Sequence, residues 1–157
     1  MRTGSNVLER NLRQLKAVKV CGEAFNPDFI GQPKWGKLYD VTYEQRLEDP
    51  LMLLDNMAAS KNILPGFRFF FDHDPRVVDS MLGDPRCGKI ILTRNPLDSY
   101  ISVKLATNTD TWVMTHMTHG KSAKVNFMAD HFDEFLDNRI GFQERIQRAL
   151  QVTGQSA

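Results

Sequence analysis

The chain has 157 residues, of which 41% are hydrophobic and 25% are charged, and its formal net charge is +1. This length suffices for one domain with a substantial core, and the composition is typical of a globular protein. The near-neutral charge gives no overall electrostatic basis for binding nucleic acid or an anionic membrane, so any basic site must be local.

The chain shows no signature of a membrane or secreted protein. No apolar run approaches the ~18 residues of a membrane span, and the start lacks the pattern of a secretory leader. The two cysteines, Cys21 and Cys87, are far apart in apolar surroundings, which favours free thiols over a disulfide. We therefore expect a cytoplasmic protein with no membrane span.

The first elements alternate between helix and strand. Hydrophobic periodicity predicts a helix over residues 5–17, and Asn6 with Glu9 three residues later resembles a capping box. A short strand is predicted at 19–22. The segment 25–41, rich in Gly, Pro and aromatic residues, is predicted to be a loop.

The middle of the chain repeats this alternation. Residues 43–60 have a helical pattern, within which Pro50 is expected to start a second helix. An aromatic run predicts a buried strand at 66–71, and a short helix is expected at 76–82.

The last third predicts one more strand and further helices. The apolar run at 88–93 is typical of a central parallel strand, and a helix is expected to start at Pro96. A loop should follow at 107–124, and one or two helices at 127–150. The alternation predicts an α/β fold with a three-layer arrangement, a mostly parallel sheet flanked by helices, in a single domain over residues 1–157.

The first candidate anion site is the sequence RTGSN at the start of the chain. Gly4 permits close backbone approach, and the helix that follows directs its N–H groups toward a ligand. Thr3, Ser5 and Asn6 add side-chain hydrogen-bonding groups, and Arg2 adds a positive charge. The alternative is that these residues only cap the helix.

The second candidate site lies in ILTRNPLDSYIS. Arg94 follows the predicted strand, and Ser102 lies eight residues later on the next helix. Ligands of α/β sheets bind at such loops, beyond the carboxyl ends of the strands. The alternative is that Arg94 pairs with Asp98 and that Ser102 faces solvent.

Together the two motifs resemble those of the sulfotransferases that use 3′-phosphoadenosine 5′-phosphosulfate (PAPS). RTGSN is similar to the family's 5′-phosphosulfate loop, and TRNPLDSYIS is similar to its 3′-phosphate motif, in which an Arg and a Ser hold the 3′-phosphate. The local similarity is to bacterial carbohydrate members of the nodulation type. The resemblance covers roughly residues 1–112. It implies a fold related to P-loop nucleotide kinases, with PAPS bound by residues 2–6, Arg94 and Ser102.

The family's pattern also extends beyond this sequence. In the family a strand precedes the phosphosulfate loop, and a later segment completes the nucleotide site. The resemblance therefore implies a partial sulfotransferase domain, truncated at both ends. Many family members also have a lysine in the phosphosulfate loop, a role that here would fall to Arg2 or to a more distant residue.

Two residues are candidates for the general base that accepts the acceptor's proton. Glu23, in CGEAFNP, resembles the glutamate of a G-E-P stretch in carbohydrate sulfotransferases, and it is favoured slightly. His73, in FFFDHDP, resembles the histidine of a K-x-H motif, although Phe71 stands at the lysine position. The structural alternatives are that Glu23 is a strand-end carboxylate or a partner of Arg2, and that His73 caps the helix starting at Pro75.

The remaining features complete the functional hypothesis. His116 and His119 lack an acidic third ligand, so no metal site is expected. The expected acceptor is a hydroxyl of a carbohydrate or another small molecule, and a second copy of the chain is a candidate partner. The alternative function is that of a catalytically silent relative that binds only a nucleotide or a protein. A P-loop phosphotransferase is disfavoured because G-x-x-x-x-G-K-[ST] is absent.

Overall fold

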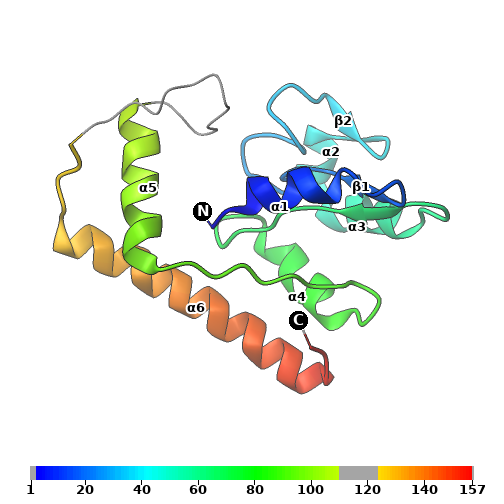
Figure 1. Cartoon of the computed structure of the whole chain (residues 1–157). Helices are drawn as coiled ribbons and strands as arrows, with labels where there is room; N and C mark the ends of the chain where they lie inside the picture. Colours follow the sequence, from blue (N-terminus) through cyan, green and yellow to red (C-terminus); the bar gives the residue numbers. More distant parts are fainter. Residues whose placement is uncertain (1–2, 110–123, 157) are drawn as a thin grey trace.

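The computed structural model describes residues 3–109 and 124–156. Helices and short strands alternate along the chain, as Figure 1 shows. In chain order, the elements are α1 (Ser5–Leu12), β1 (Val18–Val20), β2 (Lys37–Leu38), β3 (Val41–Thr42), α2 (Tyr43–Glu48), α3 (Pro50–Ala58), β4 (Leu64–Gly66), α4 (Pro75–Gly83), α5 (Pro96–Thr109) and α6 (Ala129–Thr153).

A small parallel sheet lies at the centre of the N-terminal region. β1 pairs with β4 in parallel, with Val18 opposite Leu64 and Val20 opposite Gly66, so that Pro65 lies in the middle of β4. Parallel pairing of strands that are separated by helices confirms the α/β class.

The segment predicted to be a loop at 25–41 contains part of a hairpin instead. β2 and β3 pair antiparallel around a two-residue turn at Tyr39 and Asp40, whose φ angles are 50° and 61°. Positive φ at both turn residues matches the tight turn that joins twisted antiparallel strands. The helix predicted over 5–17 is also shorter, since α1 ends at Leu12.

The prediction of a central strand at 88–93 is wrong. The segment is extended but belongs to neither sheet of the described residues. The backbone N–H and C=O groups of Ile90, Ile91 and Leu92 make no hydrogen bond within the described part of the chain. A groove of about 510 Å³ separates this segment from β4. An apolar run forms a strand only where another strand edge meets its backbone, and here none does.

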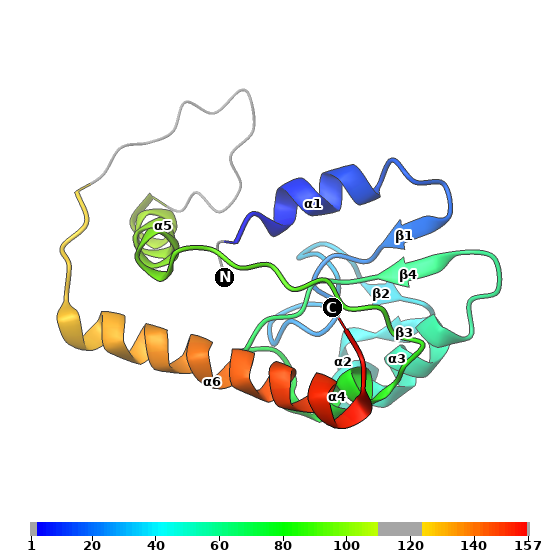
Figure 2. The same ribbon diagram turned by 60° about the horizontal axis from the view of Figure 1, so that its bottom comes forward.

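The core lies between the sheet and the helices that follow it. Its buried residues are contributed by the turns after β1, the β2–β3 hairpin and helices α3 and α4, and they include Phe25, Ile30, Leu53, Met57 and Val77. Figure 2 shows α1 on one side of β1 and β4, with α3 and α4 on the other. Burial of these apolar side chains is the main stabilising contribution to this region.

The C-terminal helix packs across the rest of the molecule. α6 is one 25-residue helix, where one or two were predicted, and it contacts α4 and α5. The ring of Tyr100 on α5 meets Phe127, Phe132 and Phe135 edge-on, with centroids 5.3–5.9 Å apart. The phenylalanines of this part of the chain therefore join α5 to α6.

Two further expectations concern the cysteines and a membrane. Cys21 is buried, Cys87 is half-buried, and both thiols are free, as predicted. Among the described residues no helix has the length and apolar character needed to cross a bilayer.

Candidate functional site

The backbone after β1 fixes the position of Glu23. Gly22 has a φ of +64°, and a Cβ at this position would lie 2.2 Å from the carbonyl oxygen of Gly31. The N–H of Glu23 donates to that oxygen at 2.8 Å, and the N–H of Gly31 donates to the carbonyl of Glu23 at 3.1 Å. Only glycine fits this close turn, so the turn holds the glutamate at the carboxyl end of β1.

Arg68, which the sequence analysis did not single out, lies next to Glu23 at the end of β4. Its N–H donates to the carbonyl of Gly22 at 2.7 Å. Its Nη2 lies 3.2 Å from Glu23 Oε1, and its Nε lies 2.9 Å from Glu9 Oε2 on α1. Its Nη1 donates to the Oδ1 of Asn6. One guanidinium thus joins the first turns of α1 to the end of β1.

His73 lies on the other side of Glu23. Its Nε2 is 3.6 Å from Glu23 Oε2, and its side chain is fully buried against the rings of Phe69 and Phe70. Neither ring nitrogen has a hydrogen-bond partner in the described part of the chain. The helix cap at Pro75, the structural alternative for this histidine, is instead Asp74, whose side chain accepts the N–H of Arg76.

The structure therefore brings both candidate bases together. We name Asn6, Glu9, Glu23, Arg68 and His73 the Arg68 cluster. Parallel pairing of β1 and β4 explains this convergence, because the carboxyl ends of parallel strands meet at one edge of the sheet. The cluster unites one residue of the predicted phosphosulfate loop with both proposed general bases.

The contacts of Glu23 stabilise its ionised form. Burial by itself would raise the pKa of this carboxyl, but its contacts with His73, Asn26 and Arg68 outweigh burial and lower the pKa below its usual value. The Nδ2 of Asn26 donates to Glu23 Oε2 at 2.8 Å. Glu23 is therefore held as a carboxylate.

The predicted phosphosulfate loop has the geometry of an uncapped helix start. Gly4 is the N-cap of α1 with a φ of 89°, and no side chain caps the helix. The predicted capping box of Asn6 and Glu9 is wrong, because Asn6 lies within the helix and both residues contact Arg68. Uncapped N–H groups and a positive φ at Gly4 suit an anion. Arg2, assigned to the same loop, lies outside the described residues.

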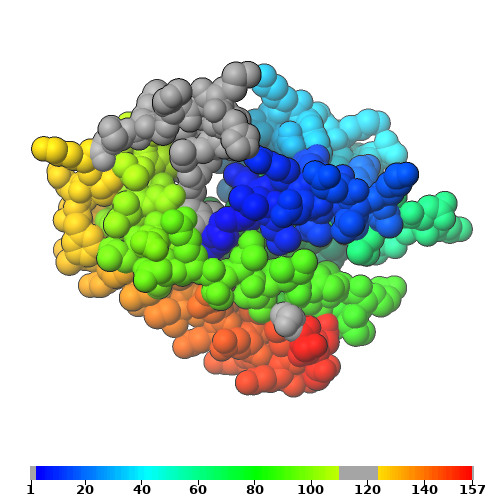
Figure 3. All heavy atoms as spheres, in the orientation of Figure 1, coloured from blue at the N-terminus to red at the C-terminus, as the bar shows by residue number. Residues whose placement is uncertain are grey.

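An elongated groove runs from this loop along the sheet. Its volume is about 510 Å³, and it is lined by Thr3 and Ser5 at one end, by β1 and β4 on one side, and by residues 88–92 on the other. Figure 3 shows this face, with α1 in blue and the segment before α5 in green. Arg68 and Glu9 also line the groove, so two residues of the Arg68 cluster face the same cavity as Thr3 and Ser5.

The predicted 3′-phosphate residues lie on a different element. Ser102 is on α5, and Arg94 lies on the segment leading into it, where its carbonyl oxygen accepts from Arg139 Nη2 at 3.0 Å. In Figures 1 and 2 the beginning of α1 lies beside the beginning of α5. The structure thus brings the two motif-bearing segments to the same side of the molecule.

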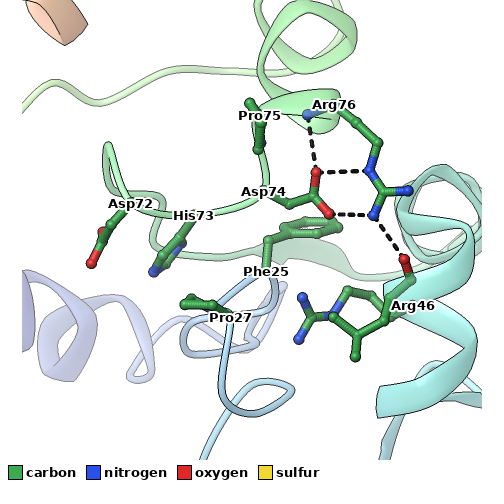
Figure 4. Close-up of a pocket in the computed structure, with 9 residues that line it drawn as sticks. Phe25, Pro27, Arg46, Asp72, His73, Asp74, Pro75 and Arg76 are labelled. Atoms are coloured by element: carbon green, nitrogen blue, oxygen red, sulfur yellow. Dashed lines mark hydrogen bonds and ion pairs between the residues drawn. The ribbon is translucent and has the colours of Figure 1, made fainter.

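A second, open pocket of about 400 Å³ borders His73 (Figure 4). Its walls are contributed by the loop after β1, by α2 and by the turn into α4, and its lining residues are Phe25, Pro27, Arg46, Leu47, Asp72, His73, Asp74, Pro75 and Arg76. The side chain of Asp74 is bound to Arg76, which leaves a mixed polar and aromatic surface next to His73.

The one buried cation of this pocket's lining is Arg46. It is 1% exposed, its Nη2 donates to the carbonyls of Asn26 and Phe29 at 2.6 and 2.9 Å, and burial lowers its pKa. Among the described residues no carboxylate lies within ion-pair distance of Arg46. Its two hydrogen bonds hold the segment that follows Glu23.

The described residues contain no group of three His, Cys, Asp or Glu side chains that could hold a metal ion, and His116 and His119 lie outside them. Comparisons with known proteins give no further information, since no family model, curated protein or solved structure matches the chain.

Proposed function

We propose that the chain is a PAPS-dependent sulfotransferase domain that transfers a sulfuryl group to a hydroxyl of a carbohydrate or other small molecule. One observation carries the proposal: the Arg68 cluster joins a residue of the loop at 3–6 to both Glu23 and His73. A group-transfer site needs an anion-binding loop and a base within reach of each other, and these residues fit both roles. The three-layer fold of nucleotide kinases belongs to this proposal.

The residues around the loop fit the donor's phosphosulfate. The N–H groups at the start of α1, with the hydroxyls of Thr3 and Ser5, are hydrogen-bond donors toward an anion in the groove. Arg94 and Ser102 would hold the 3′-phosphate. PAPS supplies the sulfuryl group, and adenosine 3′,5′-bisphosphate is the leaving product.

In this proposal Glu23 accepts the proton of the acceptor hydroxyl as the acceptor oxygen bonds to sulfur and the bond from sulfur to the phosphate oxygen breaks. The pKa of Glu23 is below its usual range, so the carboxylate is ionised at neutral pH. His73 lies beside Glu23 and lines the open pocket, which makes this pocket the proposed acceptor site. Its exposed Asp72 and Arg76 offer polar contacts of the kind that sugars use.

Calorimetry with adenosine 3′,5′-bisphosphate tests the nucleotide site on the whole chain. We expect binding by the wild type and at least a tenfold weaker affinity for Arg94→Ala, because a charge-assisted contact to the 3′-phosphate is lost. Arg145→Ala is the matched control, since this exposed arginine on α6 pairs with Asp79 and is not among the residues that line the groove. Absence of binding by the wild-type chain would overturn the proposal.

Transfer of labelled sulfate from PAPS to a panel of hydroxyl acceptors tests the chemistry. For an accepted substrate, Glu23→Gln should slow transfer by roughly 10²–10⁴-fold, the usual contribution of a positioned base. An unchanged rate would remove Glu23 from this role.

The second candidate function is nucleotide binding without catalysis. One observation favours it: the segment leading to Arg94 is not paired with the sheet. Binding of adenosine 3′,5′-bisphosphate with no transfer to any acceptor on the panel would support this function over the first.

A further inference from the structure

The guanidinium of Arg68 is shared between the anion-binding loop and the proposed base. Its three nitrogens contact Asn6, Glu9 and Glu23, which belong to α1 and to the end of β1. The side chain is 22% exposed and lines the same groove as Thr3 and Ser5. An anion in the loop would therefore lie on a surface that Arg68 also faces.

The contacts of Arg68 are not saturated. The Nε of Arg68 and the Oε2 of Glu9 lie 2.9 Å apart, but both atoms lack a properly aligned hydrogen bond although both are buried. Buried charged groups gain free energy from well-aligned hydrogen bonds, so Arg68 can give up these contacts only if a better partner enters.

The two carboxylates depend on Arg68 to different degrees. Glu9 has a second cation, Arg13, one turn along α1. Within the described residues Arg68 is the one arginine or lysine at ion-pair distance from Glu23. The other groups that face Glu23 are the ring of His73 and the amide of Asn26. Movement of Arg68 toward the loop would therefore change the charge surroundings of Glu23 more than those of Glu9.

We propose that Arg68 is a positioning residue that couples occupation of the loop at residues 3–6 to the basicity of Glu23. An anion bound there competes with Glu9 and Glu23 for the guanidinium. As Arg68 moves toward the anion, Glu23 loses its neighbouring positive charge and binds a proton more tightly. The base becomes effective when the donor is in place, which limits loss of the acceptor's proton in its absence. This inference rests on the proposed function.

The direction of the effect follows from electrostatics. Arg68 is one of the groups that lower the pKa of Glu23. A carboxylate that loses a nearby cation has a higher pKa and is a stronger base. The ligand should therefore raise the titration midpoint of Glu23. Replacement of Arg68 by a neutral residue should raise the same midpoint in the absence of ligand.

Carbon-detected NMR titration of the Glu23 carboxyl in the whole chain tests the coupling, with and without saturating adenosine 3′,5′-bisphosphate and, separately, inorganic sulfate. We expect the ligand to raise the midpoint by about half a pH unit or more, an approximately threefold change in proton affinity. Arg68→Gln should show the raised midpoint without ligand and no further shift with it. Arg68→Lys keeps the charge but cannot span three partners, so its ligand-induced shift should be smaller than in the wild type.

Arg13→Gln is the matched control, because Arg13 contacts Glu9 but not Glu23, and it should keep the full ligand-induced shift. Thermal unfolding of each variant shows that it is folded. Binding of adenosine 3′,5′-bisphosphate with an unchanged Glu23 midpoint overturns the coupling and leaves the proposed function standing. If the wild-type chain does not bind adenosine 3′,5′-bisphosphate, the proposed function and the coupling are overturned together. An Arg68→Gln midpoint equal to that of the ligand-free wild type also overturns the coupling.

Discussion

The region around β1 and β4 and the segment from residue 88 into α5 hold their candidate residues by different means. Glu23 and Arg68 are positioned by backbone bonds within and beside a two-stranded sheet. Residues 90–92 are extended without backbone hydrogen bonds in the described chain, and Ile90 is 65% exposed. The comparison shows that an apolar stretch of sequence forms a hydrogen-bonded strand only where the edge of a second strand pairs with it.

The largest expected difference is in packing, between the core beside β1 and the ring contacts that Tyr100 of α5 makes. Phe25 is 0% exposed and contacts Phe67 with centroids 5.1 Å apart. Phe25→Ala should lower the free energy of unfolding by about 3–5 kcal/mol, because it removes a fully buried ring and leaves a cavity. The matched substitution Phe127→Ala, at a ring that is 57% exposed against Tyr100, should cost only about 1 kcal/mol. Urea unfolding of both variants measures this, and equal losses would contradict the contrast between the regions.

The next largest effect compares two glycines, Gly22 and Gly154, and separates the strain of a left-handed backbone from steric crowding of an added Cβ. Gly22→Ala should destabilise the chain by about 3 kcal/mol, since it combines a left-handed residue with a Cβ placed against Gly31. Gly154, at the end of α6, has nearly the same φ of +65° but open space around it. Gly154→Ala should therefore cost only the conformational strain, about 1 kcal/mol. Thermal unfolding compares the two, and similar shifts would show that the turn at Gly22 is not crowded.

The smallest expected effect is on the pH dependence of stability. The pKa of Glu23 is lower in the folded chain than in the unfolded one, so its contribution is fully present above the unfolded value near 4.5 and is lost as the pH falls through the folded value. Glu23→Gln should make the free energy of unfolding less sensitive to acid below about pH 4.5. Asp137→Asn, at an exposed position on α6, is the control and should leave that slope unchanged. Urea unfolding between pH 3 and pH 7 measures both slopes.

Periodicity in the sequence predicted the existence of most elements but not their partners. β1 and the helices starting at Pro50 and Pro96 follow from apolar spacing and helix-start residues, but the strand predicted at 66–71 was misplaced, because β4 spans Leu64–Gly66 and the aromatic run lies beyond it. The apolar run at 88–93 predicted a buried strand, because composition reports a preference for burial and says nothing about which edge is available. The hairpin of β2 and β3 was missed since its strands have only two residues each.

The candidate site was predictable in its residue types but not in its connections. Glu23 and His73 were each identified after a predicted strand, and the parallel pairing that brings them together is a tertiary feature. Arg68 was missed because it lies in the aromatic run GFRFFF. A charged residue within such a run is itself a signal of a buried ion pair, since an unpaired charge would be costly there.

Pro65 has a consequence for how the sheet meets other molecules. The N–H of Leu64 donates to the carbonyl of Ala17 on the β1 side, so the next residue faces the opposite edge of β4, toward the groove. Proline offers no N–H there, and the edge lacks a donor at its middle position. An exposed edge of this kind is a poor template for an added strand. Pro65 thus protects the outer edge of β4 against edge-to-edge aggregation.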